Sequence, residues 1–392
     1  MGFAGRLRAL MAGRSMSTRV LARAVPCDPG YVSKLATGAK HPSAEMARRL
    51  DEILGAGGEL ELAALADDRE DAGRGLPVVD DEIGALELAR HAAASDVGGA
   101  AVDRLEQAVD GLATAYPSTP PALLLERVRA HLGYVTGLLD ARKTLAEHRR
   151  LLVAGGWLSL LAATCLIDLG RREASAANLR TAAQIAGETG HREIAAWCLE
   201  TRSWQVLTDG GYRQAAGLAY SAQRAAPRGS SAFIQATAQE GRAWARLGAA
   251  RETYDALARV EELVSPMPMP ETPEHHYQYD PAKSQAYTAT TLAWLGDPGA
   301  EGHARQVLDR LESAADGPPR PRRAASARLD LALALTAAGR LDEAAATALD
   351  AVTSRLLVPS NYWRAEEVIS AVAARDVPEG RELEEAYHGI CR

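Results

Sequence analysis

The sequence predicts an all-α protein made of a small N-terminal domain and a long body of repeated helix pairs. Apolar residues recur at helical spacing along most of the chain, and no run alternates apolar and polar residues as a half-buried strand does. Glycines punctuate the body at intervals of 38 to 48 residues, which is typical of stacked helical repeats. Because 392 residues exceed one ordinary core, we expect separate domains over 1–65 and 83–392, joined by an acidic linker over 66–82.

Charge is distributed unevenly between these parts. Residues 1–58 hold nine Lys or Arg and four acidic residues, a net charge of +5, whereas the whole chain carries −7. This asymmetry is expected when only the small domain meets a polyanion. No apolar run approaches the ~20 residues of a membrane span, and no secretion signal is evident, so we expect a cytoplasmic protein without a membrane partner. The four scattered cysteines are expected to be buried free thiols.

The first and last of four short N-terminal helices are predicted from their apolar faces. The first helix has this face at Phe3, Leu7, Leu10 and Met11. The fourth is expected to begin after Pro42 and Ser43, to end at Gly55, and to turn inward Met46, Leu50, Ile53 and Leu54.

The two middle helices are predicted from their capping residues. Ser17 can cap the second helix, which ends before Pro26 because the residue preceding a proline avoids the helical region. Asp28 can cap the third, with Pro29 at its first position and Gly38 at its end. Two helices this short are not stable alone, so their pairing indicates a helix-turn-helix.

The stretch STRVLARAVPCDPGYVSKLATGAKHPS (17–43) resembles the λ-repressor/Cro-like (XRE) family of DNA-binding domains. The matching positions are Ser17, Leu21, Ala22, Val32, Ser33, Lys34, Leu35, Gly38, Pro42 and Ser43. Two positions depart from the family pattern, with Pro26 where the turn usually has Gly and Ala36 where an acidic residue is common. The resemblance covers residues 3–55 and implies that the third helix enters the DNA major groove.

The resemblance places Pro29, Gly30 and Lys34 on the groove-facing side of the third helix. Of these, Lys34 is the best candidate for reading a base edge, such as guanine O6 and N7. Asp28 is expected to act as a helix cap rather than as a base contact. The full set of residues expected to contact bases or phosphates is Ser17, Thr18, Arg19, Pro29, Gly30, Tyr31, Lys34, Thr37, Lys40 and His41.

The body repeats a helix, glycine turn, helix pattern. The turn glycines are Gly170, Gly210, Gly248, Gly296 and Gly339. Seven residues before each lies a small residue that lets paired helices pack closely: Ala163, Ser203, Gly241, Ala289 and Ala332. This pattern, with GGYRQA (210–215) and GRLDEA (339–344), resembles tetratricopeptide (TPR) repeats, so we expect a TPR-like α-solenoid with a concave groove.

Aromatic residues on the predicted first helices, and in a segment (265–281) that interrupts the array, are candidates for lining that groove. They are Trp157, Trp197, Trp204, Trp244, Tyr277, Tyr279 and Trp294. Such anchors suit a peptide, a small molecule or a protein partner, although an ordinary inter-helix core explains them too. His275 and His276 suggest no third ligand, so we expect no metal. No cofactor is expected either.

No enzyme motif occurs in the chain. The combined architecture resembles bacterial one-component regulators, including the peptide-sensing RRNPP group, and implies a homodimeric regulator binding operator DNA. Two alternatives remain at this point. One is a TPR-type interaction adaptor in which DNA binding is minor or lost, and the other is an antitoxin-like partner.

Overall fold

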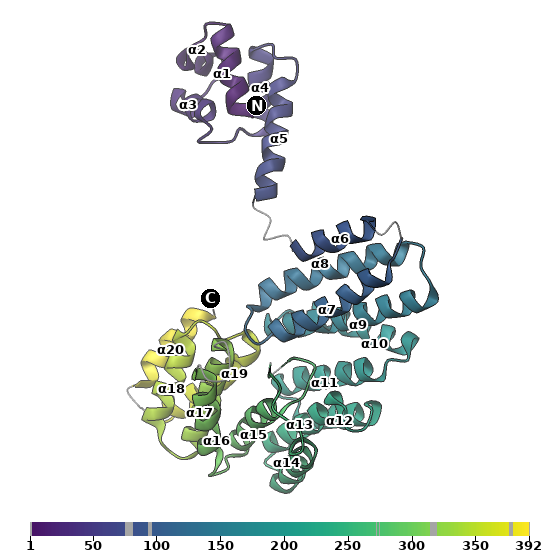
Figure 1. Cartoon of the computed structure of the whole chain (residues 1–392). Coiled ribbons are helices and arrows are strands. Elements are labelled where there is room, and N and C mark those ends of the chain that lie inside the picture. Colours follow the sequence, from purple (N-terminus) through teal and green to yellow (C-terminus); the bar gives the residue numbers. More distant parts are fainter. Residues whose placement is uncertain are drawn as a thin grey trace. The chain divides into compact units, whose positions relative to one another are not determined.

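The computed structural model describes residues 2–74, 81–92, 96–271, 273, 275–313, 320–375 and 379–391, and these contain no β-strand. The chain divides into two compact units, Met1–Asp81 and Glu82–Arg392 (Figure 1). The predicted all-α class, with a small helical domain followed by a helical array, is confirmed.

The first unit consists of five helices around a small core. They are α1 (Phe3–Gly13), α2 (Thr18–Ala24), α3 (Pro29–Thr37), α4 (Ala44–Ile53) and α5 (Glu59–Arg74). The four short helices expected from the sequence are present, and the largest fully buried side chains of the unit are Phe3, Leu7, Leu21, Leu35, Leu50, Leu54 and Leu60. Helix α5 was not anticipated as one element. It extends to Arg74, so the first part of the segment expected to be a linker is helical, while residues 75–80 lie outside the described residues.

The predicted caps are confirmed. The Ser17 hydroxyl accepts a hydrogen bond from the backbone N–H of Val20 at 3.4 Å. Asp28 accepts from the N–H of Gly30 at 2.8 Å, and Gly38 ends α3 with a φ of 79°. These side chains satisfy backbone donors that a helix start leaves unpaired.

The turn between α2 and α3 accommodates Pro26 without a left-handed residue. Val25, the residue before the proline, leaves the helix with φ −109° and ψ 64°, and the N–H of Cys27 donates to the carbonyl of Ala22 at 3.1 Å. The Gly that is usual at this turn is therefore dispensable here.

One inward prediction in α4 is wrong. Ile53 is 38% exposed, because it lies beside the buried stripe that Ala47, Leu50 and Leu54 form. Asp51 of α4 is 7% exposed and lies at the turn that leads into α5. Its carboxylate accepts hydrogen bonds from the backbone N–H groups of Gly58 (2.7 Å) and Leu60 (2.8 Å).

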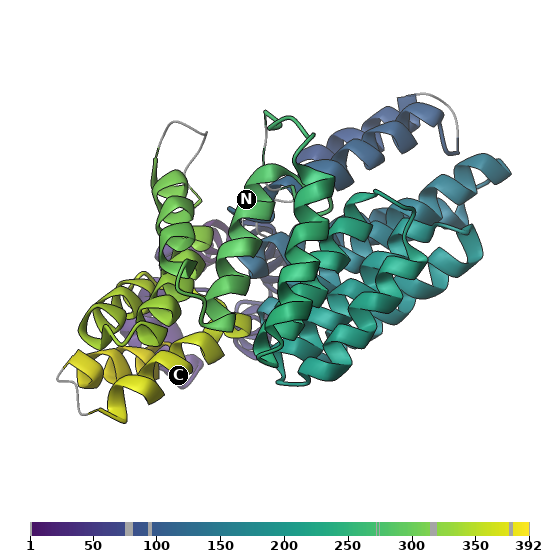
Figure 2. The ribbon, with the colours of Figure 1, turned by 90° about the horizontal axis from the view of Figure 1, so that it is seen from below.

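The second unit begins with three helices and continues as six antiparallel pairs (Figures 1 and 2). The first three are α6 (Asp81–Ala92), α7 (Gly99–Ala115) and α8 (Pro121–Asp140). The pairs are α9 (Leu145–Asp168) with α10 (Arg172–Thr189), α11 (Arg192–Thr208) with α12 (Tyr212–Ala225), α13 (Ser231–Arg246) with α14 (Ala250–Val264), α15 (Pro281–Leu295) with α16 (Ala300–Glu312), α17 (Pro321–Ala337) with α18 (Leu341–Thr353), and α19 (Tyr362–Ala373) with α20 (Glu379–Ile390). A 3₁₀ turn, η2 (Pro359–Asn361), precedes the last pair.

The five predicted turn glycines join the first five pairs. Gly170, Gly210, Gly248, Gly296 and Gly339 all adopt left-handed backbone conformations, with φ between 68° and 84°. Every small residue predicted seven positions earlier is buried, as the close packing of paired helices requires. The repeat prediction is confirmed in its helical pairing, and the sixth pair lies beyond the last glycine of the pattern.

Helix α9 is long and apolar enough, by length and composition alone, to cross a membrane, which the sequence prediction of no membrane span did not anticipate. Its most apolar window is 83% buried inside the second unit, as expected of a central core helix. The cysteine prediction is confirmed for Cys165 and Cys198, whereas Cys27 is half-buried and Cys391, just after α20, is exposed.

Candidate nucleic-acid interface and repeat-domain cavity

Helix α3 is fixed in the first unit by one face and exposed on the other. Val32 and Leu35 are fully buried against the core, next to Ala22 of α2. The opposite face exposes Pro29, Gly30 and Lys34, and at the helix end Thr37 is exposed as well. The structure therefore brings these sequence-predicted residues to one surface.

The flanking candidates surround this helix. The Lys40 ammonium lies 4.9 Å from the centre of the Tyr31 ring, which is itself half-buried. The Thr37 hydroxyl donates to the carbonyl of Ser33 at 3.0 Å. At the start of α2, Ser17 and Arg19 are exposed.

Two further residues were predicted to contact DNA beside this helix. Thr18 is half-buried and His41 is exposed. Asp28 acts as a cap, as its two hydrogen bonds to the N–H groups of Gly30 and Tyr31 require.

Unpaired positive charge is present on these helices. Within the described part of the chain, Arg19 and Lys34 form no ion pair, whereas Arg6 pairs with Glu59 at 3.1 Å and Arg49 with Glu45 at 2.6 Å. Long side chains without an internal carboxylate partner are free to meet phosphate or a base edge.

Comparison with known families bears on this unit alone. A family described as a helix-turn-helix domain matches residues 3–65. The matched residues include α2 and α3, the two paired helices of the predicted helix-turn-helix. A helix-turn-helix domain supports a DNA-binding regulator in general. The search of curated proteins gives no match for the chain.

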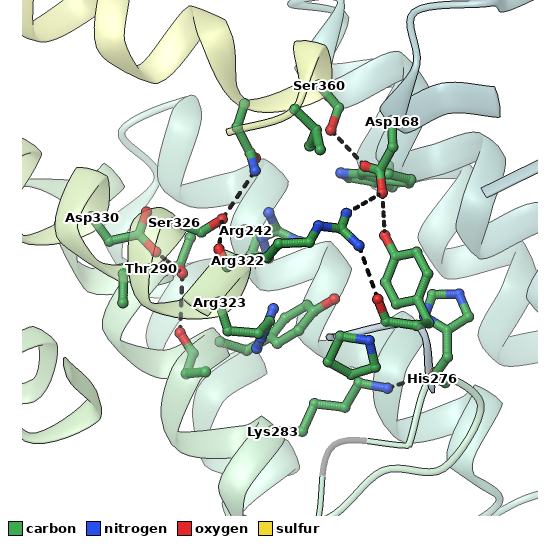
Figure 3. Close-up of a pocket in the computed structure, with 18 of the residues that line it drawn as sticks. Asp168, Arg242, His276, Lys283, Thr290, Arg322, Arg323, Ser326, Asp330 and Ser360 are labelled. Atoms are coloured by element: carbon green, nitrogen blue, oxygen red, sulfur yellow. Dashed lines mark hydrogen bonds and ion pairs between the residues drawn. The ribbon is translucent and has the colours of Figure 1, made fainter. Parts of the chain in front are cut away.

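The second unit contains a cavity of about 150 Å³ lined mainly by the first helices of successive pairs (Figure 3). Residues from α9, α11, α13, α15, α17 and α19 face it, together with residues of α16 and η2, Tyr116 just after α7, His276 of the interrupting segment and the stretch before η2. Its wall combines apolar side chains such as Val307 and Leu311 with the charged residues Asp168, Glu200, Arg242, Lys283, Arg322, Arg323, Asp330 and Arg364.

The aromatic groove candidates are divided among several environments. Trp197 and Trp204 line this cavity, while Trp157 and Tyr277 line a second one of about 440 Å³. Tyr279 is buried in a separate small core. Trp294 is 8% exposed and Trp244 is half-buried in the core, so neither of these two faces an open groove.

The chain's own interrupting segment covers part of the predicted groove. The ring of Tyr277 lies 4.7 Å from that of Trp157 and 5.3 Å from that of Trp197. The N–H of His276 donates to the carbonyl of Ala113 in α7 at 3.2 Å. The Lys283 ammonium donates to three carbonyls of this segment, the shortest at 2.6 Å to His276.

A buried cluster around Asp168 fixes one wall of the cavity. Its carboxylate accepts hydrogen bonds from Tyr116 (2.8 Å) and Ser360 (2.8 Å) and pairs with Arg322 at 3.0 Å. Burial raises the pKa of Asp168, and these three partners oppose the rise. The cluster joins α7, α9, α17 and η2, which are far apart in the sequence.

Sequence reasoning missed the charged residues of the cavity. Asp168 ends a helix whose preceding residues from Leu151 onward are uncharged, and Arg242 directly follows the small residue Gly241 of the repeat pattern. Charges at such core-facing positions were the available signal. Within the described residues, no cluster of three His, Cys, Asp or Glu side chains is suited to holding a metal ion.

Proposed function

We propose that the protein is a cytoplasmic, homodimeric transcriptional regulator whose helix α3 reads operator DNA and whose TPR-like second unit receives a signal. The observation that carries the proposal is the exposed α3 face, with Lys34 free of internal carboxylates, in a domain of the helix-turn-helix family. The net charge of +5 over residues 1–58 supports a polyanionic partner for this unit.

Residue roles follow from the exposed surface. Lys34 reaches a base edge in the major groove, and Pro29 and Gly30 allow the start of α3 to approach the bases closely. Arg19, Lys40 and His41 contact phosphates on either side, with Ser17, Thr18 and Thr37 as neighbouring hydroxyl donors. The Tyr31 ring, covered by Lys40, positions that lysine at the edge of the interface.

Two copies are proposed because one short helix makes few contacts. Pairing two helices ~34 Å apart on a pseudo-palindromic site is the usual way for such domains to gain affinity. A signal bound by the second unit would then favour or disfavour the matching spacing. This part of the proposal rests on the resemblance of the predicted architecture to that of one-component regulators.

Selection of bound duplexes from a random library, using the full chain, tests the DNA-reading role. On a selected site, Lys34→Ala should cost about 1–3 kcal/mol and relax the preference at one base position. Affinity should also fall steeply with added salt, because phosphate contacts release counterions. Arg8→Ala is the matched control, since Arg8 is an exposed arginine on α1, outside the α2–α3 pair.

Three results would count against this function. One is a library without enrichment, another is binding insensitive to salt, and the third is equal effects of the two substitutions. A salt-insensitive protein complex without DNA affinity would instead favour the interaction adaptor.

A further inference from the structure

The cavity of the second unit contains a buried cation without a carboxylate partner. Arg242 is 5% exposed, and among the described residues its one hydrogen-bond acceptor is Gln239 Oε1 at 2.9 Å. The faces of its guanidinium are covered by Trp294 and Tyr287, at 4.5 and 4.8 Å from the ring centres. The Nε–H of Arg242 points outward in the plane of the guanidinium, whereas the two rings cover only its faces. This N–H therefore has no acceptor among the described residues.

A second buried arginine lies in the same wall. Arg364 is 7% exposed and pairs with Asp330 at 3.2 Å, while Asp330 also accepts a hydrogen bond from Thr290 at 2.5 Å. Burial lowers the pKa of Arg364, and the positive charges of Arg242 and Arg323 lower it further. The guanidinium groups of Arg242 and Arg364 lie 4.5 and 5.1 Å from the centre of the same Trp294 ring, so their charges repel one another. Two carboxylates are nearby: Asp330 pairs with Arg364, and Glu200, whose pKa burial raises to about 7, interacts with Arg242 without forming an ion pair.

Two neighbouring buried guanidinium groups are unfavourable when their charge is only partly compensated. A buried charge is tolerated when a counter-charge and hydrogen bonds compensate its lost hydration. An oxyanion between the guanidinium groups would accept their free N–H donors and reduce the repulsion. Arginine forks match the two oxygens of a carboxylate or of a phosphate.

The space available limits the size of the ligand. A cavity of about 150 Å³ is comparable to one that holds a benzene molecule, so an extended peptide does not fit inside it. The neighbouring stretch around Tyr277 is already occupied by the chain itself. Apolar walls at Ala286, Val307 and Leu311 would enclose the uncharged part of the ligand.

We propose that this cavity binds a small molecule bearing a carboxylate or phosphate group, held by Arg242 and Arg364. The inference rests on the proposed function, since it names the chemistry of the signal that the second unit receives. It is tested without DNA, so its failure is distinguishable from a failure of operator binding.

The thermal stability of the full chain, followed by tryptophan fluorescence, provides the test. The probes are sodium acetate, sodium benzoate and inorganic phosphate at tens of millimolar. Each is compared with chloride at equal ionic strength. Benzoate is also compared with benzamide, its neutral counterpart. At least one oxyanion should raise the melting temperature by about 3 °C or more above chloride, because it binds the folded state alone. A response to the carboxylates or to phosphate identifies which group the cavity prefers.

Arg242→Met keeps the apolar stem and removes the charge, so it should abolish that rise. The matched control is Arg251→Met on α14, whose side chain is 90% exposed and which should respond like the unchanged protein. The proposal is overturned if no oxyanion exceeds chloride, if benzamide matches benzoate, or if Arg242→Met retains the full response. The first two comparisons use the unchanged protein and do not depend on the folding of a variant.

Discussion

Glu200 makes the stability of the second unit depend on pH, and Glu200→Gln should remove that dependence. Glu200 lies on α11, is 5% exposed, and accepts a hydrogen bond from Gln235 at 2.8 Å. Burial raises its pKa from the usual 4.5 to about 7, against the opposing effects of Gln235, Lys283 and Arg242. Because the folded state holds this proton more tightly, the stabilisation is complete below pH 4.5 and is lost as the pH rises through 7.

The size of the effect follows from the difference between the two pKa values. A difference of roughly 2.5 units at 1.36 kcal/mol per unit gives about 3 kcal/mol lost between about pH 4.5 and 7.5. Glutamine keeps the shape of the protonated carboxyl and does not ionise. The variant should therefore match the unchanged protein near pH 5 and exceed its stability near pH 8.

Urea unfolding followed by tryptophan fluorescence measures this effect in the second unit alone, because all six tryptophans lie between residues 157 and 363. Unfolding free energies would be compared at several pH values from 5 to 8. Glu252→Gln is the control, since Glu252 is exposed on α14 and should leave the slope unchanged. Parallel pH profiles for Glu200→Gln and the unchanged protein would refute the reasoning.

Three smaller predictions concern local structure. Gly210→Ala should destabilise the second unit by about 1–2 kcal/mol, since Gly210 has a φ of 84°, whereas Gly187→Ala, in open space within α10, should be neutral or stabilising in the same urea assay. Asp168→Asn should cost about 3–5 kcal/mol, because it leaves the buried Arg322 without its counter-charge; an unchanged unfolding midpoint would contradict this. Ser17→Ala should cost about 1 kcal/mol, measured as faster hydrogen exchange in α2, and unaltered exchange there would exclude the cap.

Local chemistry explains why much of the fold could be predicted. The side chain of Asp28 caps the start of α3, and the left-handed backbone of Gly38 ends it. Gly210 and Gly339 form the turns of two helix pairs through the same left-handed backbone conformation. Each signal lies within a few residues of the structure it specifies. The extension of α5 to Arg74 was missed because its acidic, weakly periodic sequence resembles a linker, and its start depends on a side chain from α4, Asp51.

The two candidate sites also differ in how far apart their residues lie in the sequence. The exposed face of α3 could be predicted because Lys34 and its neighbours belong to one short segment with a known pattern. The cavity could not, since Arg242, Arg322 and Arg364 belong to three helices that only the stacking of repeats brings together. The fold of the interrupting segment back onto Trp157 and Trp197 likewise depends on contacts distant in the sequence.

Trp294 illustrates how an aromatic residue can mark a site without lining it. The sequence suggested an anchor for an apolar partner, but the ring is 8% exposed and the guanidinium groups of Arg242 and Arg364 lie 4.5 and 5.1 Å from its centre. A ring face attracts cations and gives a flexible arginine one preferred orientation. Trp294 therefore stabilises two positive charges in the cavity wall and offsets part of their mutual repulsion. Aromatic residues on the first helices of such an array can thus serve an anion site by holding its arginines.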